Sequence, residues 1–405
     1  GNHSFQVRFM PSASQAGALQ NFDSFVLSRV PFIPAGRFKS SDTIPVSTLP
    51  NSLAKNNWWA LQPTIDATQA PALDLSFMND PVGAHGFVTM KDGGLSFEDG
   101  TPVRFWGPNV SYWQGNLVYM DHLTADRFAE FLARQGVNIV RIHIMHAINS
   151  LIDASRNNTQ EFDAGKLDRL DYLLAALGRR GIYVNIDFMF HRTFKSGDGV
   201  GAELCLPVSG NRRDDPDYNI SWACGAAAFW HPRVIELNLA LYKKLLTHIN
   251  PYTGRSLAET PQMAMCTIHN EQSIFWGTSN MRRGETAEIL DRIFTAWLKH
   301  KYGSHTNLAA AWQVPAADAP LAADEHLDDG VVKVGPIVMN AQGAQRLRAA
   351  DQVRFLYDME TGFYRHVIAA MRSWGVKCPL ITSNWQGGGN TTRLVLQAST
   401  LGEIV

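Results

Sequence analysis

The sequence predicts an α/β protein of the (β/α)8 TIM-barrel type, and three observations support this prediction. From residue 103 onward, short apolar runs rich in β-branched residues alternate with helical patterns that carry one apolar face. So many strand–helix units in succession favour a closed barrel over a doubly wound sheet. No glycine-rich phosphate fingerprint follows the first predicted strand, which argues against a nucleotide-binding fold of the Rossmann type.

The predicted strands follow a short hairpin. Residues 86–90 and 95–97 read as two strands joined by a turn at Asp92-Gly93-Gly94. Barrel strands are then predicted at 103–107, 137–144, 182–188, 263–269 and 379–383, and residues 403–405 read as the beginning of a sixth.

The predicted helices lie between these strands. Thr124 and Asp163 are expected to cap the first two helices, because their side chains can accept from free backbone amides. Pro232 is expected to open a third. Its apolar face consists of Val234, Leu237, Leu241 and Leu245. Two longer helices are predicted at 285–302 and 343–374.

Two regions are predicted along the chain. Residues 1–85 are poor in charge and rich in Ser, Pro and Asn, and we expect a β-rich accessory module or an extended arm there. Residues 86–405 form the predicted barrel, which stops before its seventh strand. Because an open barrel would expose a long sheet edge, we expect a second chain or fragment to supply the remaining strands.

Composition narrows the class of partner. Lys and Arg total 36 against 37 for Asp and Glu, so no net field attracts nucleic acid or an anionic membrane. Charged residues are only 18%, while aromatic and amide residues are plentiful, which suits a neutral ligand such as an oligo- or polysaccharide. No membrane span is expected, since no apolar run reaches about 18 residues. A glycan substrate would place the protein outside the cell or in the periplasm.

The four cysteines give local information. Cys205 and Cys224 lie in one polar stretch and could close a loop as a disulfide in an oxidising compartment. Cys266 and Cys378 lie in apolar strand-like runs, where a buried free thiol is expected. No CxxC pair occurs, so we expect no structural zinc and no cofactor.

The candidate site follows from the rule that barrel enzymes use residues at the carboxyl ends of their strands. The pair Asn270-Glu271 directly follows the 263–269 strand, and Glu271 is the candidate catalytic acid. Glycosidic cleavage requires one carboxylic acid to protonate the leaving oxygen, donors for sugar hydroxyls, and flat rings for stacking. The candidate substrate-binding residues are Asn109, Arg141, His143, His191, His269, Asn270 and Asn384, with Trp113, Trp276 and Trp385 as stacking residues.

Four stretches carry a likeness to a known group of enzymes. They are Thr-Pro-Val-Arg-Phe-Trp-Gly-Pro-Asn at 101–109, Val-Asn-Ile-Val-Arg at 137–141, Thr-Ile-His-Asn-Glu at 267–271, and Phe-Thr-Ala-Trp-Leu-Lys-His-Lys-Tyr-Gly at 294–303 with Ala311-Trp312 downstream. The chain resembles clan A of the retaining glycoside hydrolases, which includes families 5 and 42. The likeness spans about residues 86–405.

This resemblance implies a retaining double displacement on a β-linked neutral glycan. Glu271 would act as general acid and then as general base, and Asn270 would contact the sugar 2-hydroxyl. The nucleophile would be a glutamate on the seventh strand, about 5–5.5 Å away. Glu403 is a poor candidate because it lies at the start of a strand, the wrong end of a barrel. We expect the unidentified nucleophile to be the acid that pairs with Arg141.

Two other functions stay open. The chain could be a non-catalytic carbohydrate-binding barrel, or a metal-dependent barrel hydrolase. Against the metal site, His143 and His146 are three apart and would point to opposite faces of a strand. A calcium site at Asp214, Asp215 and Asp217 is weaker than an ordinary solvated loop. The glycan, its linkage and endo or exo action are not determined by the sequence.

Overall fold

The computed structural model divides into Gly1–Gln62 and Pro63–Val405, and every residue described below belongs to the second unit. The structure describes residues 74–110, 117–145, 151–190, 192, 194–205, 226–277, 284–315, 318, 320–336, 338, 340–384 and 391–404.

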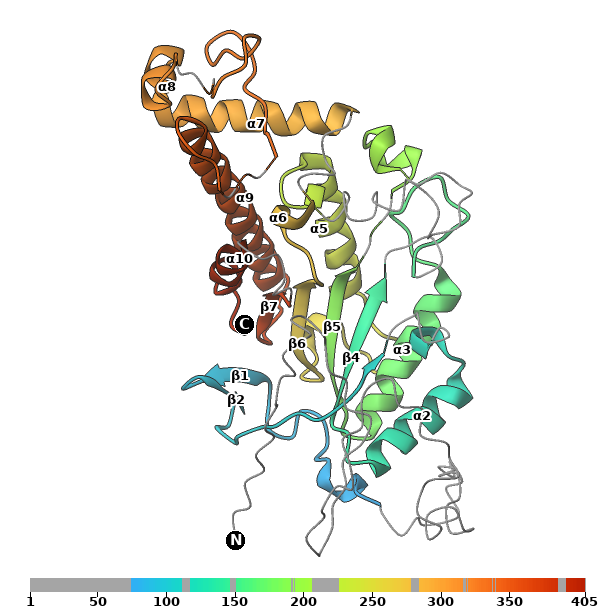
Figure 1. Ribbon diagram of the computed structural model, residues 1–405. Coiled ribbons are helices and arrows are strands. Elements are labelled where there is room, and N and C mark those ends of the chain that lie inside the picture. Colours follow the sequence, from blue (N-terminus) through green and yellow to red (C-terminus); the bar gives the residue numbers. More distant parts are fainter. Residues whose placement is uncertain are drawn as a thin grey trace, which may run out of the picture. The chain divides into compact units, whose positions relative to one another are not determined.

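A parallel sheet forms the centre of this unit (Figure 1). Its strands follow the chain order β3-β4-β5-β6-β7, and each pairs in parallel with the next. They are β3 (Asn109–Val110), β4 (Ile139–Met145), β5 (Tyr183–Phe190), β6 (Met263–His269) and β7 (Leu380–Ser383). Ile404 adds an isolated parallel bridge to Ile381, where the sequence predicts a sixth strand. The α/β class with parallel strands is confirmed, and the described strands form an open sheet.

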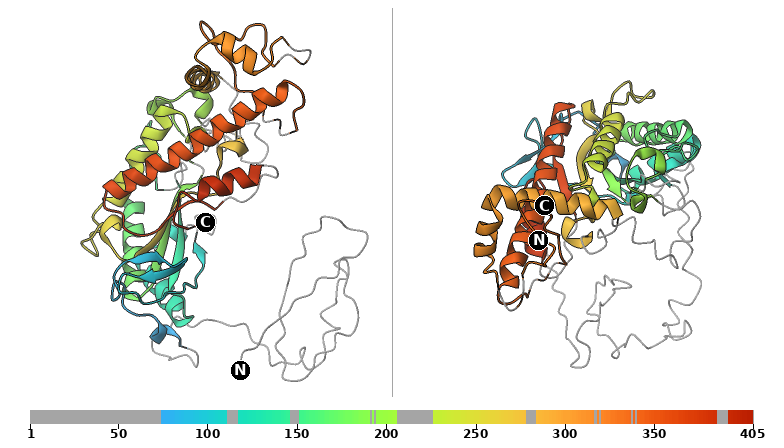
Figure 2. Two further views of the ribbon diagram at one scale, coloured as in Figure 1. Left: turned by 90° about the vertical axis from the view of Figure 1, so that its left-hand side faces the viewer. Right: turned by 90° about the horizontal axis from the view of Figure 1, so that it is seen from above.

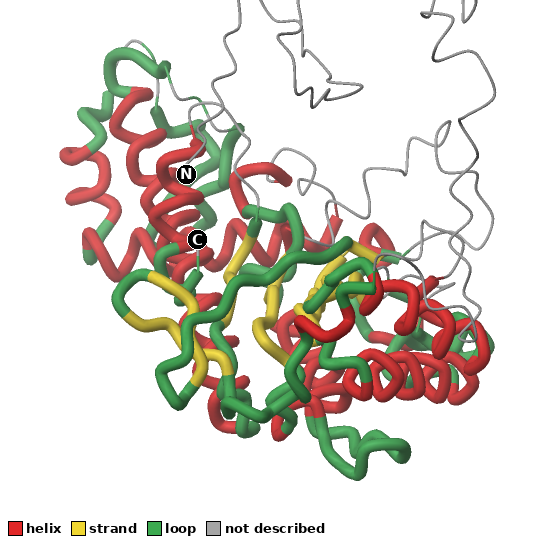
Figure 3. Tube along the Cα trace, turned by 90° about the horizontal axis from the view of Figure 1, so that it is seen from below, coloured by secondary structure: helices red, strands yellow, loops and turns green. Residues whose placement is uncertain are grey.

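Helices flank the sheet at both edges. Near β4, α2 (His122–Arg134) and α3 (Ala164–Arg179) lie side by side (Figure 1). Figure 3 shows helices on both sides of the strands. Beyond β7 lie the long α9 (Gln345–Ser373) and α10 (Thr392–Ser399). Figure 2 shows α9 extending from the sheet toward α7. The other helices are α5 (Pro232–Leu246), α6 (Ile274–Gly277), α7 (Gly284–Tyr302) and α8 (His305–Ala311).

The core lies between the sheet and these helices. Val234, Leu237, Leu241 and Leu245 are all buried, as their helical spacing predicts. Burying one such side chain contributes about 1.5–3 kcal/mol relative to leaving it exposed.

Several local predictions are confirmed. Asp163 caps α3 by accepting from the Lys166 amide, and Pro232 is the first residue of α5. The hairpin forms from β1 (Val88–Lys91) and β2 (Gly94–Phe97). Asp92 and Gly93 at its turn have φ of 52° and 77°. A two-residue turn with both φ positive is the type I′ turn that matches the twist of the flanking strands.

Two local predictions are wrong. Asp121, not Thr124, caps α2, because the Asp121 side chain accepts from the Thr124 amide. The first barrel strand does not occupy 103–107 but begins at Asn109. The Asn138 side chain accepts from the Trp106 amide and donates to the Arg104 carbonyl, so a side chain takes part of the place of main-chain pairing here. Trp106 is 72% exposed.

The close approach of this segment to β4 depends on Gly107. A Cβ built on Gly107 would lie 1.6 Å from the carbonyl oxygen of Ile139. Any other residue at position 107 would therefore force this segment away from β4.

Two predicted free thiols are confirmed, since Cys266 and Cys378 are buried and carry no disulfide. Burial raises the pKa of the Cys378 thiol to about 12. Cys224 and the Asp214–Asp217 cluster lie outside the described residues. Among the helices that the structure describes, none has the length and apolar character that crossing a bilayer requires.

Candidate functional site

Glu271 is the second residue after β6 and has an unusual backbone. Its φ is +48°, in the left-handed region that residues other than Gly, Asn and Asp rarely adopt. The Glu271 amide donates to Asn384 Oδ1 at 2.8 Å, and the residue is exposed. The turn therefore presents a carboxylate to solvent at the carboxyl end of the sheet, while Asn384 beyond β7 fixes its main chain.

A chain of hydrogen bonds continues from this amide across the strand ends. Since the Glu271 amide can only donate, Asn384 must use its oxygen there and its NH2 group elsewhere. That NH2 group donates to Asn270 Oδ1 at 3.0 Å, and Arg141 Nη2 donates to the same oxygen at 2.7 Å. Both donors hold the Asn270 oxygen inside the network. The Asn270 NH2 group is consequently the part of this amide that can donate to a ligand.

Arg141 is held in turn by a fully buried acid. Arg141 Nη2 lies 2.5 Å from Oδ2 of Asp187, whose side chain is 0% exposed. The sequence prediction that Arg141 pairs with an unidentified nucleophile is therefore wrong. Its acid partner is Asp187, on the neighbouring strand β5.

His143 completes this cluster. Its Nε2 lies 2.8 Å from Arg141 Nη1, and its Nδ1 lies 2.9 Å from Asp187 Oδ2. Because a guanidinium only donates, Nε2 accepts from Arg141. His143 therefore lies against both members of the Arg141–Asp187 pair.

The remaining predicted site residues fall into three groups. Asn109 on β3 is exposed and lies opposite Arg141 in the parallel register. His269 is fully buried, with its ring centroid 4.9 Å from that of Phe229 and 6.1 Å from that of Phe363, so it packs inside an aromatic cluster. Trp113, His191 and Trp385, like His146, lie outside the described residues, and only the backbone of Trp276 is described.

Three residues to which the sequence prediction gave no role belong to this network or to the segment that follows Glu271. Asp187 was recognisable as a polar residue at a strand end, but its pairing with Arg141 depends on the order of the strands. Ser273 and Glu360 form a contact two residues beyond Glu271. Ser273 Oγ donates to Glu360 Oε2 at 3.0 Å.

Glu403 does not take part in this site. Its carboxylate accepts from Arg372 and from the Leu380 amide at the beginning of β7. Glu403 thus lies at the start of a strand, as the sequence predicts, whereas Glu271 lies beyond the opposite end of the strands. Glu403 therefore joins α9 to β7.

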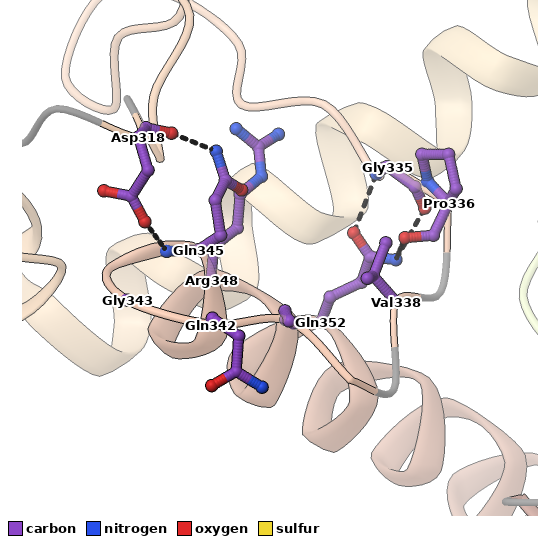
Figure 4. A pocket seen from close by; sticks show the side chains of 11 residues that line it. Asp318, Gly335, Pro336, Val338, Gln342, Gly343, Gln345, Arg348 and Gln352 are labelled. Atoms are coloured by element: carbon purple, nitrogen blue, oxygen red, sulfur yellow. Dashed lines mark hydrogen bonds between the residues drawn. The ribbon is translucent and has the colours of Figure 1, made fainter.

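A separate hollow of about 760 Å³ lies beside the first turns of α9 (Figure 4). Its polar lining groups bind one another. The Gln345 amide donates to Asp318 at 2.9 Å, and the Gly335 amide donates to Gln352 Oε1 at 2.7 Å. Gln352 precedes Glu360 by eight residues, about 12 Å along a helix, so the hollow is distinct from the Glu271 site.

Among the residues that the structure describes, no cluster of three or more His, Cys, Asp or Glu side chains could hold a metal ion. The polar groups at the strand ends are instead arranged as paired donors and acceptors.

No known family model and no curated protein matches the sequence. Among solved structures, the chain is similar to the Rhizomucor miehei endo-1,4-beta-mannanase, at 15% identity over 56% of this chain and 58% of that one, with a TM-score of 0.36. It is similar to the Halorubrum lacusprofundi beta-galactosidase at 16% identity over 74% of this chain and 39% of that one, with a TM-score of 0.48. For the Marinomonas ef1 beta-galactosidase the identity is 16%, the coverages are 73% and 40%, and the TM-score is 0.47.

These structural neighbours are glycoside hydrolases, and the aligned regions span 39–58% of their lengths. Identities of 15–16% with TM-scores below 0.5 do not assign an activity to this chain.

Proposed function

We propose that this protein is a retaining glycoside hydrolase that cleaves β-linked neutral glycans, with Glu271 as its acid/base and the described sheet as part of a (β/α)8 barrel wall. One observation carries the proposal. An unbroken hydrogen-bonded path runs from the Glu271 amide through Asn384 and Asn270 to Arg141, and so joins residues from or directly following three strands of the sheet around one exposed carboxyl group.

The proposed chemistry assigns a step to each part of this path. The Glu271 carboxyl group donates a proton to the leaving glycosidic oxygen and later accepts one from water. The Asn270 NH2 group, whose orientation is fixed by its two donors, binds a sugar hydroxyl beside the bond that breaks. Double displacement also requires a nucleophilic carboxylate about 5–5.5 Å from the acid. The described residues do not identify it.

The test uses Glu271→Ala with two aryl β-glycosides of different leaving group. Loss of a general acid should slow the substrate with the poor leaving group by about 10²–10⁴-fold. A nitrophenolate leaves without protonation, so hydrolysis of that substrate should fall much less. The matched control is Glu288→Gln, an exposed glutamate on α7 that should leave both rates unchanged. Equal loss on both substrates, or no loss, contradicts the assignment.

A second candidate function is carbohydrate binding without cleavage. The observation that favours it is the state of Asp187, the buried acid of the cluster, which is bound to Arg141 and His143 and so is not available as a nucleophile. Calorimetric binding of an oligosaccharide without turnover of either aryl glycoside would support this candidate.

A further inference from the structure

Glu271 and the two residues after it are each hydrogen-bonded to a different neighbour. The Glu271 amide binds Asn384, and the Gln272 carbonyl accepts from Ser383 Oγ at 3.1 Å. Both of these contacts come from the end of β7. The third contact comes from a helix, since Ser273 Oγ donates to Glu360 on α9.

Ser273 lies at the centre of this third contact. Its oxygen accepts from the Phe275 amide at 3.2 Å while its hydroxyl proton is directed to the Glu360 carboxyl group. The backbone of Ile274 also hydrogen bonds to that carboxyl group. Glu360 therefore binds the main chain and side chain at the start of α6, two and three residues beyond Glu271.

The surroundings of Glu360 are unusual for a carboxyl group. Its side chain is 0% exposed, and it makes no ion pair with any residue that the structure describes. The rings of Phe363 and Tyr364, in the next turn of α9, pack against Phe229 beside the end of β6. Burying an unpaired carboxyl group is costly, so an ordinary helix position would favour an apolar residue.

We propose that Glu360 is a positioning residue for the candidate acid/base: by binding Ser273 and the start of α6, it fixes the main chain that carries Glu271. The inference rests on the proposed function of Glu271. The contact acts through geometry, because Glu360 touches the turn and not the reacting atoms. Burial raises the pKa of Glu360 to about 8, against the two hydrogen bonds that lower it, so the group that holds the turn at neutral pH is a neutral acid.

Two substitutions separate positioning from simple packing. Glu360→Gln keeps a neutral acceptor of the same shape for Ser273 and Ile274. Glu360→Met fills a similar volume but cannot accept a hydrogen bond, and an apolar residue in place of an unpaired buried carboxyl group should not lower stability. Ser273→Ala removes the same contact from the other side, and Glu288→Gln is the exposed control.

Two readouts are compared at pH 7. Amide hydrogen exchange in residues 271–277 should accelerate about tenfold or more in Glu360→Met and Ser273→Ala and stay within about twofold of wild type in Glu360→Gln. On the aryl β-glycoside with the poor leaving group, kcat of Glu360→Met should fall about tenfold or more with KM within about twofold, because misplacing a catalytic group by 1 Å can cost 10²-fold. Glu360→Gln should retain the wild-type kcat.

Wild-type exchange and wild-type kcat in Glu360→Met would overturn the inference. A Glu360→Gln variant as impaired as Glu360→Met would overturn it as well, because the acceptor geometry would then not be what holds the turn. The exchange measurement does not need turnover. A wild-type chain that hydrolyses no glycoside would refute the proposed function, while the exchange data would still decide whether Glu360 fixes the turn.

Discussion

Helix α9 binds one buried glutamate, Glu325, and carries a second, Glu360, and the two carboxyl groups behave in opposite ways. Beside its first turns, Glu325 accepts two hydrogen bonds from the Arg348 guanidinium, at 2.5 and 2.6 Å. It also accepts from the amides of Ala322 and Lys333, both at 2.8 Å. Burial pushes the pKa of Glu325 upward, but these donors outweigh it and hold the pKa below its usual value.

Farther along the same helix, Glu360 has two hydrogen bonds and no counter-charge among the described residues, and its pKa is raised to about 8. Both glutamates are nearly inaccessible to solvent, with exposures of 5% and 0%. Burial alone therefore does not determine the charge of a carboxyl group. The hydrogen-bond donors around the carboxyl group do. They favour an ionised Glu325 beside the first turns of α9, whereas Glu360, near the segment that follows Glu271, is a neutral acid.

The largest predicted effect is at the ionised end. Arg348→Met leaves the Glu325 charge buried without its partner and should lower the free energy of unfolding by about 3–5 kcal/mol. Urea unfolding at pH 7 measures this change. In the double variant Arg348→Met/Glu325→Gln much of the loss should be recovered, because no charge is then stranded. A single-variant loss below about 1 kcal/mol would show that Glu325 is not stabilised as described.

The next effect concerns the pH dependence that Glu360 imposes. From its usual pKa of 4.5 up to about 8, the unfolded chain releases this proton while the folded chain keeps it. The folded state therefore loses stability as pH rises, by up to about 1.4 kcal/mol per pH unit from this group. Tyr364, the titratable neighbour on α9, has a pKa raised well above 10 by burial and stays neutral over this window.

Glu360→Gln should remove that slope, so the difference in unfolding free energy between variant and wild type should grow steadily from pH 5.5 to 7.5. Urea unfolding at three pH values within this window measures it. Parallel stability curves would mean that Glu360 is ionised in the folded protein.

The smallest effect is expected where a carboxylate is exposed. Glu288 and Arg292 on α7 form an ion pair with side chains 72% and 58% exposed. Arg292→Met should change the free energy of unfolding by less than about 1 kcal/mol, because water screens both charges. A loss comparable to that of Arg348→Met would contradict the view that burial and donors together set the effect of each glutamate.

The sequence predicted well those features that depend on local signals. β6 spans the predicted residues 263–269, and Pro232 and Asp163 act at the helix ends where their chemistry predicts. The glycine-containing hairpin turn is equally local. In each case the residue type restricts the backbone of its immediate neighbours, so no knowledge of distant contacts is needed.

The missed features depend on contacts between distant residues. The 103–107 run has the composition of a strand, but Asn138, more than 30 positions away, occupies the hydrogen-bonding position of its partner strand. Arg141 meets Asp187 only because β4 and β5 are neighbours in a particular register, with His143 opposite Asp187.

Glu360 did leave a signal in the sequence. It is four residues from both Leu356 and Tyr364, which are buried, so it lies on the apolar stripe of α9. An ionisable residue on that stripe indicates that its side chain is buried and hydrogen-bonded in the protein interior. The sequence could not show which group meets it, since Ser273 is 87 positions away.

The backbone of Glu271 has a consequence for how this position tolerates change. Its left-handed φ would suit glycine or asparagine better, so a glutamate there is held against a local preference of about 1–2 kcal/mol. Residue 271 is thus a place where the demands of folding and of chemistry disagree. Glycine at position 271 would adopt this backbone conformation without strain but would remove the carboxyl group. Glutamate supplies the carboxyl group but keeps the backbone in an unfavourable conformation.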